Sequence, residues 1–532
     1  MNKFKVLFIY PNGTLMNPPP ISVGLFTALL KREGVELALF DTTFYTEATS
    51  ITSDDAKERF MQSTPVDDAV RRSKLKTTDM VDDFVKIIDD FKPDLIVASI
   101  LEITYAPALK LLDAIGDYPA PVLAGGVLAY SAPRLILQNK HIDYVCMGEG
   151  EGLLVDICQA LAAGGDVRSI ANLAYLDGGQ LVQNPMRPLE DISAQPVPDY
   201  SLFEPERLLR PMGGKIYRAV PVETNRGCPY KCTFCNSPYT LKMYRDNGTS
   251  GFFRKKSAAA IGRELEELVR VHDAEYVYFA SDTFILFNDQ EFDEFCEVYA
   301  RYKLPFWIQT RAETVTEERI ERLAELGCHR MSMGLEHGNE DFRSRVIHKR
   351  FDNIDMIKAS EIVEQAEIPL TVNNIIGFPG ETRELIFDTV HLNRNLTFDS
   401  VNASPFAPFH GTDLQTVCVK EGFIEPDHTP GSFLSDFALD QPQLSREEVL
   451  GLRKTFALYV RFPEKDWPLI ERAEKDDEEG NRIYDELRAR YANSYFHAGG
   501  DEEQNWEDDA KLLENRMLTV DDITRGKSAT YD

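Results

Sequence analysis

The stretch Asn225-Arg-Gly-Cys-Pro-Tyr-Lys-Cys-Thr-Phe-Cys235 contains three cysteines, Cys228, Cys232 and Cys235, at a three-then-two spacing. This spacing can supply three thiolates to one 4Fe–4S cluster, which leaves one iron without a protein ligand. Electron-transfer clusters of this type take four cysteines, so three ligands indicate a centre that binds substrate or cofactor at its open iron. The alternative is a zinc knuckle, but a tetrahedral zinc site requires a fourth Cys or His nearby, and the next candidate, His272, is far along the chain.

The motif, with the aromatic Phe234 before its last cysteine, resembles the signature of the radical S-adenosylmethionine (SAM) superfamily. The resemblance implies that the open iron chelates the amino and carboxylate groups of SAM. It also implies that an electron from the cluster cleaves the sulfonium to give a 5'-deoxyadenosyl radical. An external electron donor such as flavodoxin or ferredoxin is then expected as a partner.

The composition is that of a globular protein, with 532 residues and 43% hydrophobic content, which predicts about three domains. The net charge of -29 argues against nucleic acid as a partner. No stretch approaches the roughly 20 apolar residues of a membrane span, and the N-terminus lacks a signal-peptide pattern. We therefore expect a cytoplasmic protein, and the resemblance implies a small-molecule substrate. The remaining cysteines are interpreted as buried, inert thiols: Cys146, Cys158, Cys296, Cys328 and Cys418.

Residues 1–180 alternate short apolar strands with helical segments, which predicts a doubly wound, Rossmann-like parallel sheet in an α/β fold. The polar stretch 43–78 interrupts this alternation, and the sequence gives it no role. The expected strands are 5–10, 37–41, 94–99, 122–126 and 143–148, and the expected helices are 22–32, 79–91, 106–115 and 151–162.

Prolines punctuate residues 181–220, which predicts an extended linker. Residues 221–415 then alternate again, which predicts a partial (β/α)6 barrel with active residues at the carboxyl ends of its strands. Residues 416–532 carry helix signals, including a capping box from Ser445 to Glu448. The expected barrel strands are 222–225, 276–280, 306–311, 330–335, 370–376 and 401–404, and the helices are 258–272, 289–302, 317–326, 355–367 and 384–395.

Three segments of the expected barrel place polar residues and glycines where a nucleotide-like ligand would lie: Gln309-Thr-Arg311, Gly334-Leu-Glu-His-Gly338 and Asn373-Asn-Ile-Ile-Gly-Phe-Pro-Gly-Glu381. Glu336 or Arg311 could instead form a structural ion pair, and Asp282 could cap the next helix. His337 and His410 are interpreted as satisfied loop histidines. The SAM contacts that the resemblance implies are Phe234, Asp282, Arg311, Glu336, Asn373, Gly377 and Pro379.

The N-terminal domain provides a second resemblance. Ser99-Ile-Leu101, Gly125-Gly126 and Gly148-Glu-Gly-Glu-Gly152 follow its third, fourth and fifth strands, an arrangement similar to the cobalamin-binding domain of many radical SAM enzymes. Glycines there open a crevice for a nucleotide tail, and a side chain at Gly126 is expected to obstruct it. A plain doubly wound domain has similar glycines. The implied cobalamin contacts are Ser99, Leu101, Gly125, Gly126, Gly148 and Glu149.

One departure concerns the loop after the first strand. The usual cobalamin fingerprint places an Asp-x-His-x-x-Gly sequence there, whereas the segment from Asn12 to Gly24 has no histidine and offers only Met16 and Asn17 as weak donors. If cobalamin binds, cobalt has no protein histidine beneath it. The same absence leaves open a vestigial domain that binds no cobalamin.

The resemblance implies a cobalamin-dependent radical SAM enzyme of the class B methyltransferase type that methylates an unactivated carbon. In that scheme one SAM loads a methyl group onto cobalamin, a second is cleaved at the cluster, and the substrate radical takes the methyl group. One alternative is non-methylating radical chemistry, such as ring cyclisation, ring contraction or carbon–carbon coupling. Another is a non-catalytic sensor. The sequence does not predict the substrate, the oligomeric state or the role of the C-terminal region.

Overall fold

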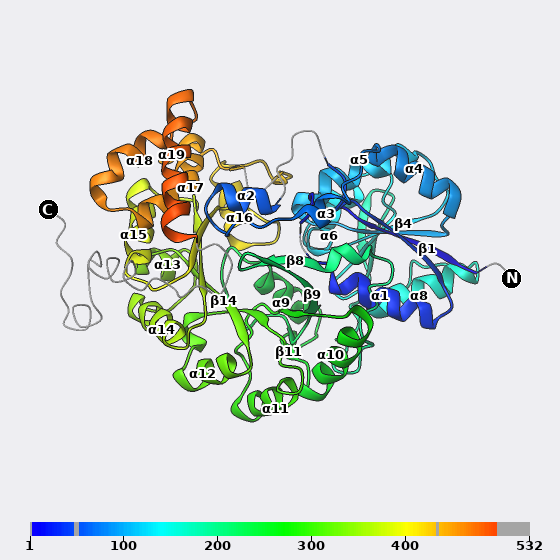
Figure 1. Ribbon diagram of the computed structural model, residues 1–532. Helices are drawn as coiled ribbons and strands as arrows, with labels where there is room; N and C mark the ends of the chain where they lie inside the picture. Colours follow the sequence, from blue (N-terminus) through cyan, green and yellow to red (C-terminus); the bar gives the residue numbers. More distant parts are fainter. Residues whose placement is uncertain (1–2, 17, 47–52, 432–435, 497–532) are drawn as a thin grey trace.

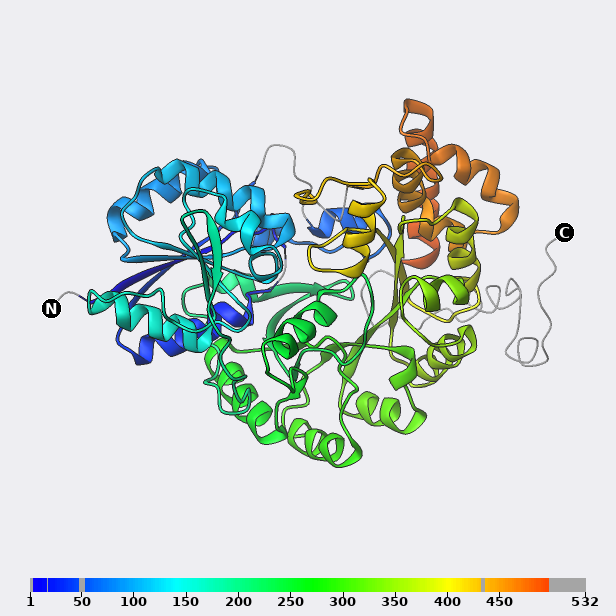
Figure 2. The same ribbon diagram turned by 180° about the vertical axis from the view of Figure 1, so that it is seen from behind.

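The computed structural model describes residues 3–16, 18–46, 53–431 and 436–496. Their strands form two seven-stranded sheets and one two-stranded sheet, and helices follow at the C-terminal end (Figures 1 and 2). The N-terminal sheet lies beside a curled central sheet, and the last helices pack on the far edge of that central sheet. The predicted α/β architecture is confirmed. None of the described helices is long and apolar enough to cross a membrane.

The N-terminal sheet has the order β2-β1-β3-β4-β5-β6-β7, with its first five strands parallel. Its inner strands are continuous apolar runs because helices cover both faces. Its strands are β1 (Lys5–Tyr10), β2 (Glu36–Asp41), β3 (Leu95–Ser99), β4 (Val122–Gly125), β5 (Tyr144–Cys146), β6 (Leu173–Asp177) and β7 (Gln180–Gln183). Its helices are α1 (Ile21–Arg32), α4 (Met80–Phe91), α5 (Tyr105–Ile115), α6 (Val127–Ser131), α7 (Pro133–Leu137) and α8 (Glu151–Ala162).

The hairpin β6–β7 differs from the expectation of a linker that begins at residue 181. Gly178 and Gly179 both have positive φ, 55° and 82°, which is the backbone of a two-residue hairpin turn. The glycine pair therefore joins two antiparallel strands of the N-terminal sheet, and the extended connection begins only after Gln183.

The central sheet has the order β16-β15-β14-β13-β12-β9-β8, with six parallel strands and the antiparallel edge strand β8. It is the expected partial barrel. Its strands are β8 (Leu209–Met212), β9 (Lys215–Val222), β12 (Tyr276–Phe279), β13 (Phe306–Thr310), β14 (Cys328–Glu336), β15 (Leu370–Ile376) and β16 (Ser400–Pro405). Its helices are α10 (Ala258–His272), α11 (Asp289–Tyr299), α12 (Glu317–Glu325), α13 (Glu340–Arg345), α14 (Asn353–Gln365) and α15 (Arg383–Asn393).

The first barrel strand lies earlier than predicted. β9 ends at Val222, and Asn225–Arg226 forms β10, which pairs with β11 (Arg254–Lys255) in the separate two-stranded sheet. The neighbouring prolines made the region look like linker. Pro221, however, sits near the end of β9, in register with Tyr278 of β12.

The helices after the barrel confirm the C-terminal prediction for the residues that the structure describes. Ser445 and Glu448 form the expected capping box. Val449, Leu452, Phe456 and Tyr459 are at most 2% exposed, as core residues should be. These helices are α16 (Asp413–Lys420), α17 (Arg446–Arg461), α18 (Trp467–Ala473) and α19 (Glu478–Tyr495); the expected helical residues 497–532 lie outside the described part.

A buried ion pair joins the N-terminal domain to the barrel. Glu102, just after β3, accepts hydrogen bonds from the backbone N–H of His410 (2.7 Å) and from its Nδ1 (3.0 Å). Nε2 of His410 lies 3.3 Å from the Pro426 carbonyl oxygen. Both ring nitrogens thus face acceptors, which favours the doubly protonated imidazolium.

We predict that this pair stabilises the protein more at low pH than at high pH. Burial alone lowers the pKa of His410, but the hydrogen bond and charge of Glu102 raise it above its ordinary value. The contribution is complete below the unfolded pKa of about 6.5 and is lost as pH rises through the folded pKa. Urea unfolding should therefore show His410→Gln destabilised by about 2 kcal/mol at pH 6 and by clearly less at pH 9.

Glu102→Gln is the matched control, because it removes the charge from the other side of the pair. Both variants should flatten the same part of the stability–pH curve. An undiminished difference between His410→Gln and the parent protein at pH 9 would contradict the assignment.

Candidate functional site

The three motif cysteines lie on one loop between β10 and α9 (Asn236–Asp246), just beyond the carboxyl end of β9. The loop is held by its own backbone: the Cys228 N–H donates to Ser237 Oγ (3.0 Å), and the Cys235 N–H donates to the Cys232 carbonyl (3.2 Å). All three thiols are free, and burial raises the pKa of Cys235 to about 12. Iron must therefore displace protons to bind here. One loop with three unpaired thiols fits a three-thiolate cluster.

Arg311, an expected SAM contact, is held against this loop. Its guanidinium stacks on the Tyr230 ring at 3.7 Å from the ring centroid, and it pairs with Glu313. Its Nη1 donates to Cys232 Sγ at 3.3 Å. The structural ion pair of Arg311, which the sequence left open as an alternative, is therefore present with Glu313 as the partner. The Nη1 donor of Arg311 points at Cys232, an expected cluster ligand.

The other expected SAM residues gather at the same ends of the barrel strands. Glu336, at a left-handed φ of 66°, pairs with Lys349 Nζ at 2.9 Å, so its anticipated structural ion pair is present too. Asn373 accepts from Asn402 Nδ2 (2.6 Å). Phe234 packs edge-on against Phe378, which lies between Gly377 and the buried Pro379.

The loop after β15 is fixed by a carboxylate that the sequence did not single out. Glu381 Oε2 accepts hydrogen bonds from the backbone N–H groups of Gly377 (2.5 Å) and Phe378 (2.8 Å). Its other oxygen lies 3.0 Å from Nε2 of the fully buried His337. Nδ1 of His337 accepts the Asn339 N–H at 3.0 Å, so the ring has a protein partner on each side, although the Nε2 contact with Glu381 lacks hydrogen-bond geometry. The signal for Glu381 was its place at the end of the glycine-rich segment.

Asp282 lies at the same rim and has no hydrogen-bond partner among the described residues. It does not cap the next helix, because Asn288 is the N-cap of α11. Asp282 remains exposed at its surface, yet nearby protein atoms partly desolvate its carboxylate, which raises the pKa above the ordinary value. The negative charge of Glu223 raises the pKa further. A carboxyl on a concave surface experiences both effects.

The residues expected to form the cobalamin crevice lie together at the carboxyl ends of β3 and β4. Ser99 and Gly125 lie opposite each other in register, and Ser99, Leu101, Gly125 and Gly126 all stay partly exposed. The Ser99 hydroxyl has no hydrogen bond within the described residues. A Cβ on Gly125 would meet nothing closer than Cys146 Cβ at 3.9 Å, so open space lies in front of this glycine.

The expectation that a side chain at Gly126 would obstruct only the ligand, and leave the fold intact, is wrong. Its φ of 103° is unfavourable for L residues, and a Cβ would collide with the carbonyl oxygen of Ile100. The backbone itself requires this glycine. Gly125 is the position at which a side chain can report on the crevice.

Gly148 and Glu149 are engaged at the junction with the barrel. The Tyr244 hydroxyl occupies the space of a Cβ on Gly148 and accepts the Glu149 N–H at 2.8 Å. Burial alone raises the pKa of Glu149, but Arg254 and Arg226 hold it below its ordinary value. These contacts account for both residues without a ligand, and long-range pairs of this kind have no local sequence signal.

The crevice and the cysteine loop meet directly. Tyr130 of α6, which begins just after Gly126, is stacked with Tyr239 of α9, which begins just after Cys235; the ring centroids are 6.5 Å apart. The Tyr130 hydroxyl lies 3.0 Å from Thr240 Oγ1. Asn236 Nδ2 also donates to the His410 carbonyl (2.8 Å), which continues the contact to Glu102. The barrel mouth therefore faces the crevice, as expected.

The loop after β1 contributes no histidine to this crevice. Leu15 adopts a left-handed φ of 54°, and the buried Met16 has its carbonyl bonded by Asn12 Nδ2 at 2.5 Å. Asn17, the other expected weak donor, lies outside the described residues.

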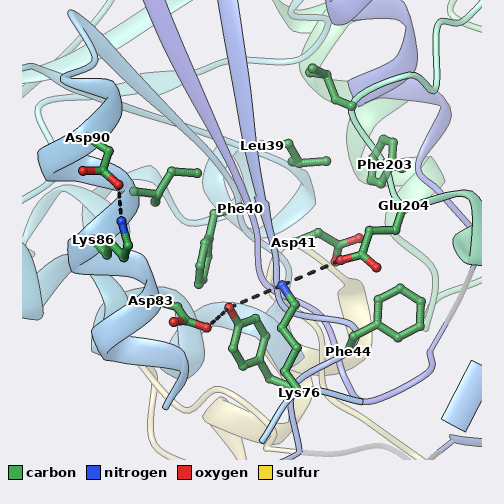
Figure 3. A pocket seen from close by; sticks show the side chains of 13 residues that line it. Leu39, Phe40, Asp41, Phe44, Lys76, Asp83, Lys86, Asp90, Phe203 and Glu204 are labelled. Carbon is green, nitrogen blue, oxygen red and sulfur yellow. Dashed lines mark hydrogen bonds and ion pairs between the residues drawn. The ribbon is translucent and has the colours of Figure 1, made fainter. Parts of the chain in front are cut away.

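A separate pocket of about 400 Å³ lies beside the edge strand β2, between α4 and residues 202–204 (Figure 3). Its polar side chains have partners within the protein: Lys76 lies 3.7 Å from Glu204, Lys86 pairs with Asp90, and the neutral Tyr45 hydroxyl donates a hydrogen bond to Asp83 (2.8 Å). No motif residue lines this pocket, so the functional site is the junction described above.

Two family models match the chain in the same order as these features. The B12 binding domain matches residues 66–157, and the Radical SAM superfamily matches residues 222–392. The first match covers the crevice strands and the second covers the cysteine loop and the SAM rim. Together they support the expected cofactors: a 4Fe–4S cluster, SAM and cobalamin.

Curated relatives include methyltransferases and a ring-forming enzyme. An uncharacterized methyltransferase of Pyrococcus horikoshii is 27% identical over 64% of this chain and 73% of its own length. Cytidylyl-2-hydroxyethylphosphonate methyltransferase of Streptomyces wedmorensis is 21% identical over 80% and 83%. The anaerobic magnesium-protoporphyrin IX monomethyl ester cyclase of Cereibacter sphaeroides is 26% identical over 54% and 47%.

Solved structures share the fold. The radical SAM methyltransferase TsrM of Kitasatospora setae, with cobalamin and a 4Fe–4S cluster bound, superposes with a TM-score of 0.60 at 18% identity, over 79% of this chain and 78% of that one. The cobalamin-dependent radical enzyme OxsB superposes with 0.63 at 16% identity, over 100% and 76%. The chain therefore combines a region that matches the Radical SAM superfamily with a region that matches the B12 binding domain.

Proposed function

We propose that this protein transfers a methyl group to an unactivated carbon of a small molecule. The observation that supports the proposal is the contact between α6 and α9, because α6 follows the proposed cobalamin segment at Gly126 and α9 follows the cysteine loop that ends at Cys235. When bound, the cluster with SAM supplies a 5'-deoxyadenosyl radical, and cobalamin supplies the methyl group. Methyl transfer requires that both act on one substrate, and direct contact between the two segments supports such an arrangement.

The chain's own groups have distinct tasks in this proposal. The cluster is held by Cys228, Cys232 and Cys235. Arg311 donates a hydrogen bond to the Cys232 sulfur and places a positive charge beside it. The contacts proposed for SAM are Phe234, Asp282, Glu336, Asn373, Gly377 and Pro379, and those for cobalamin are Ser99, Leu101, Gly125 and the backbone near Gly126. A flavodoxin or ferredoxin of the cytoplasm is proposed as the electron donor.

Non-methylating radical chemistry is the second candidate. The Cereibacter relative is a cyclase, so the two domains together do not require methylation. A non-catalytic sensor is a third candidate, and the free carboxyl of Asp282 at the SAM rim argues for a catalytic site instead.

The three candidates make different products. Anaerobically reconstituted protein with cobalamin, SAM and a strong reductant should form both 5'-deoxyadenosine and S-adenosylhomocysteine, measured by mass spectrometry. 5'-Deoxyadenosine alone would favour non-methylating chemistry, and neither product would favour the sensor. The triple Cys228→Ala, Cys232→Ala, Cys235→Ala variant should lose iron and 5'-deoxyadenosine; a full cluster in this variant would refute the ligand assignment.

A second prediction isolates the crevice. Gly125→Val should reduce bound cobalamin at least tenfold, because the new methyl groups project into the open space while the fold tolerates the Cβ. Iron content and 5'-deoxyadenosine formation should remain near the parent level. Gly126→Val is the contrasting variant, and it should lose folded protein because its backbone forbids the side chain. Normal cobalamin content in a well-folded Gly125→Val protein would place the cofactor elsewhere.

A third prediction concerns Arg311. Hydrogen bonds to cluster sulfurs raise the reduction potential, so Arg311→Met should lower the midpoint potential of the reconstituted cluster by about 60 mV, which is about 1.4 kcal/mol for one electron. Electron paramagnetic resonance during a redox titration measures this shift. Arg322→Met, which removes a partly exposed arginine of α12 that pairs with Asp293, should leave the potential unchanged. An unshifted potential in an Arg311→Met protein with full iron content would contradict the assigned hydrogen bond.

A further inference from the structure

The insertion between β2 and α4 lies against both edges of the open barrel sheet. It contains α2 (Ser53–Arg59) and α3 (Ala69–Arg72), and both views show α2 between the N-terminal domain and the C-terminal helices (Figures 1 and 2). Phe60 stacks under Arg453 of α17, which packs on the edge strand β16, at 3.6 Å. At the opposite edge, Lys74 pairs with Glu206 (2.7 Å), just before β8. The described residues of the insertion therefore contact α17, which packs on β16 at one edge of the sheet, and the segment just before β8 at the other edge.

The barrel face that the insertion covers is polar. Alternate residues of the strands face the outer helices and are fully buried, such as Val277, Ile308 and Met333. Most side chains on the opposite face are polar or aromatic, and Ile375 and Pro221, which is in register with Tyr278, are aliphatic exceptions: Tyr278, Trp307, Gln309, Ser332, Thr371, Asn373, Ile375, Ser400, Asn402 and Ser404. A surface of amides, hydroxyls and aromatic rings suits a ligand with hydrogen-bonding groups and does not suit a hydrocarbon.

An aromatic pair forms a platform on this face. The rings of Tyr278 and Trp307 are stacked, with centroids 4.4 Å apart and planes 9° apart. Trp307 Nε1 donates to Ser332 Oγ at 3.0 Å, which fixes the indole. The guanidinium of Arg210, from β8, lies over the Tyr278 ring at 5.0 Å from its centroid.

Arg210 has no hydrogen-bond acceptor in the part of the chain that the structure describes, and its Nε is buried without a partner. The nearby carboxylate, Asp54, is shared with two other cations, because Lys57 and Arg71 both pair with it. Lys57 of α2 lies near Arg210. Burial lowers the pKa of Lys57, the positive charge of Arg210 lowers it further, and the negative charge of Asp54 acts in the opposite direction. Asp54 lies 3.5 Å from Lys57 Nζ and is already bonded by Arg71 at 2.7 Å. Three cations, Lys57, Arg71 and Arg210, thus gather around two carboxylates, Asp54 and Asp68, and the cluster has room for one further anion.

We propose that the substrate is a polar anion, a phosphate or carboxylate, whose charged group is bound by Arg210 and Lys57 and whose planar or sugar-like part lies on the Tyr278–Trp307 platform. The insertion from the cobalamin-binding domain thus provides one wall of the substrate site. This inference rests on the proposed function, because it takes the barrel interior as the place where the substrate binds.

Binding of small probes tests the proposal independently of catalysis. Phenyl phosphate, benzoate and neutral benzyl alcohol are titrated into the reconstituted full-length protein and followed by ligand-observed NMR. At least one anionic probe should bind tenfold more tightly than benzyl alcohol and should weaken as salt is added. Comparing the affinities of phenyl phosphate and benzoate shows whether the site prefers a phosphate or a carboxylate. Equal binding of all three probes would overturn the proposal.

Variants then assign the site. Arg210→Ala should weaken the preferred anion at least tenfold, and Lys57→Ala should weaken it less, whereas Arg210→Lys should retain part of the affinity. Arg218→Ala removes the same charge from the neighbouring strand β9 at a half-exposed position and should have no effect. Unchanged binding in an Arg210→Ala protein of normal circular dichroism and iron content would refute the assignment. Anion binding without S-adenosylhomocysteine formation would refute only the methyl-transfer proposal.

Discussion

The contact between α6 and α9 is the constraint on which the rest of the site depends. Each helix starts where a cofactor segment ends, so stacking Tyr130 on Tyr239 fixes the separation of two chemistries that arise in different domains. The buried pair of Glu102 and His410 holds the same junction from a second direction. Glu149 with Arg226 and Arg254 holds it from a third. A rigid junction suits radical chemistry, because a reactive intermediate must meet its partner before it meets water.

Much of the architecture could be predicted because its signals are local. Cysteine spacing, the alternation of strands with helices, and the capping box at Ser445 all reside within short windows, and each has its expected place in the structure. Errors arose where one local pattern has two structural meanings. The pair Gly178–Gly179 reads as linker or as hairpin turn, and only the partner strand decides between them. Pro221 had a similar ambiguity, because a proline in this region can belong to a linker or to the end of a strand.

The site was predictable in type and less so in role. Arg311, Glu336 and Glu149 are charged residues at strand ends, where a ligand contact and an ion pair look alike in sequence. The structure gives each of them a protein partner: Glu313, Lys349 and Arg254. Glycine has a similar ambiguity, because Gly125 opens a crevice whereas its neighbour Gly126 serves the backbone. The pair of Glu102 and His410 is separated by 308 residues, and no short pattern announces it.

The insertion's contact with the C-terminal helices has a consequence for how the chain folds. The Tyr484 hydroxyl donates a hydrogen bond to the Arg59 carbonyl across 425 residues. The insertion therefore cannot complete its packing until α19 has been synthesised. During synthesis Phe60 and the fully buried Met61 must remain without this shelter while the barrel forms. Contacts of such long range slow folding and prolong the exposure of apolar surface. The protein's yield in cells is thus expected to depend on chaperones that protect the nascent N-terminal half until translation ends.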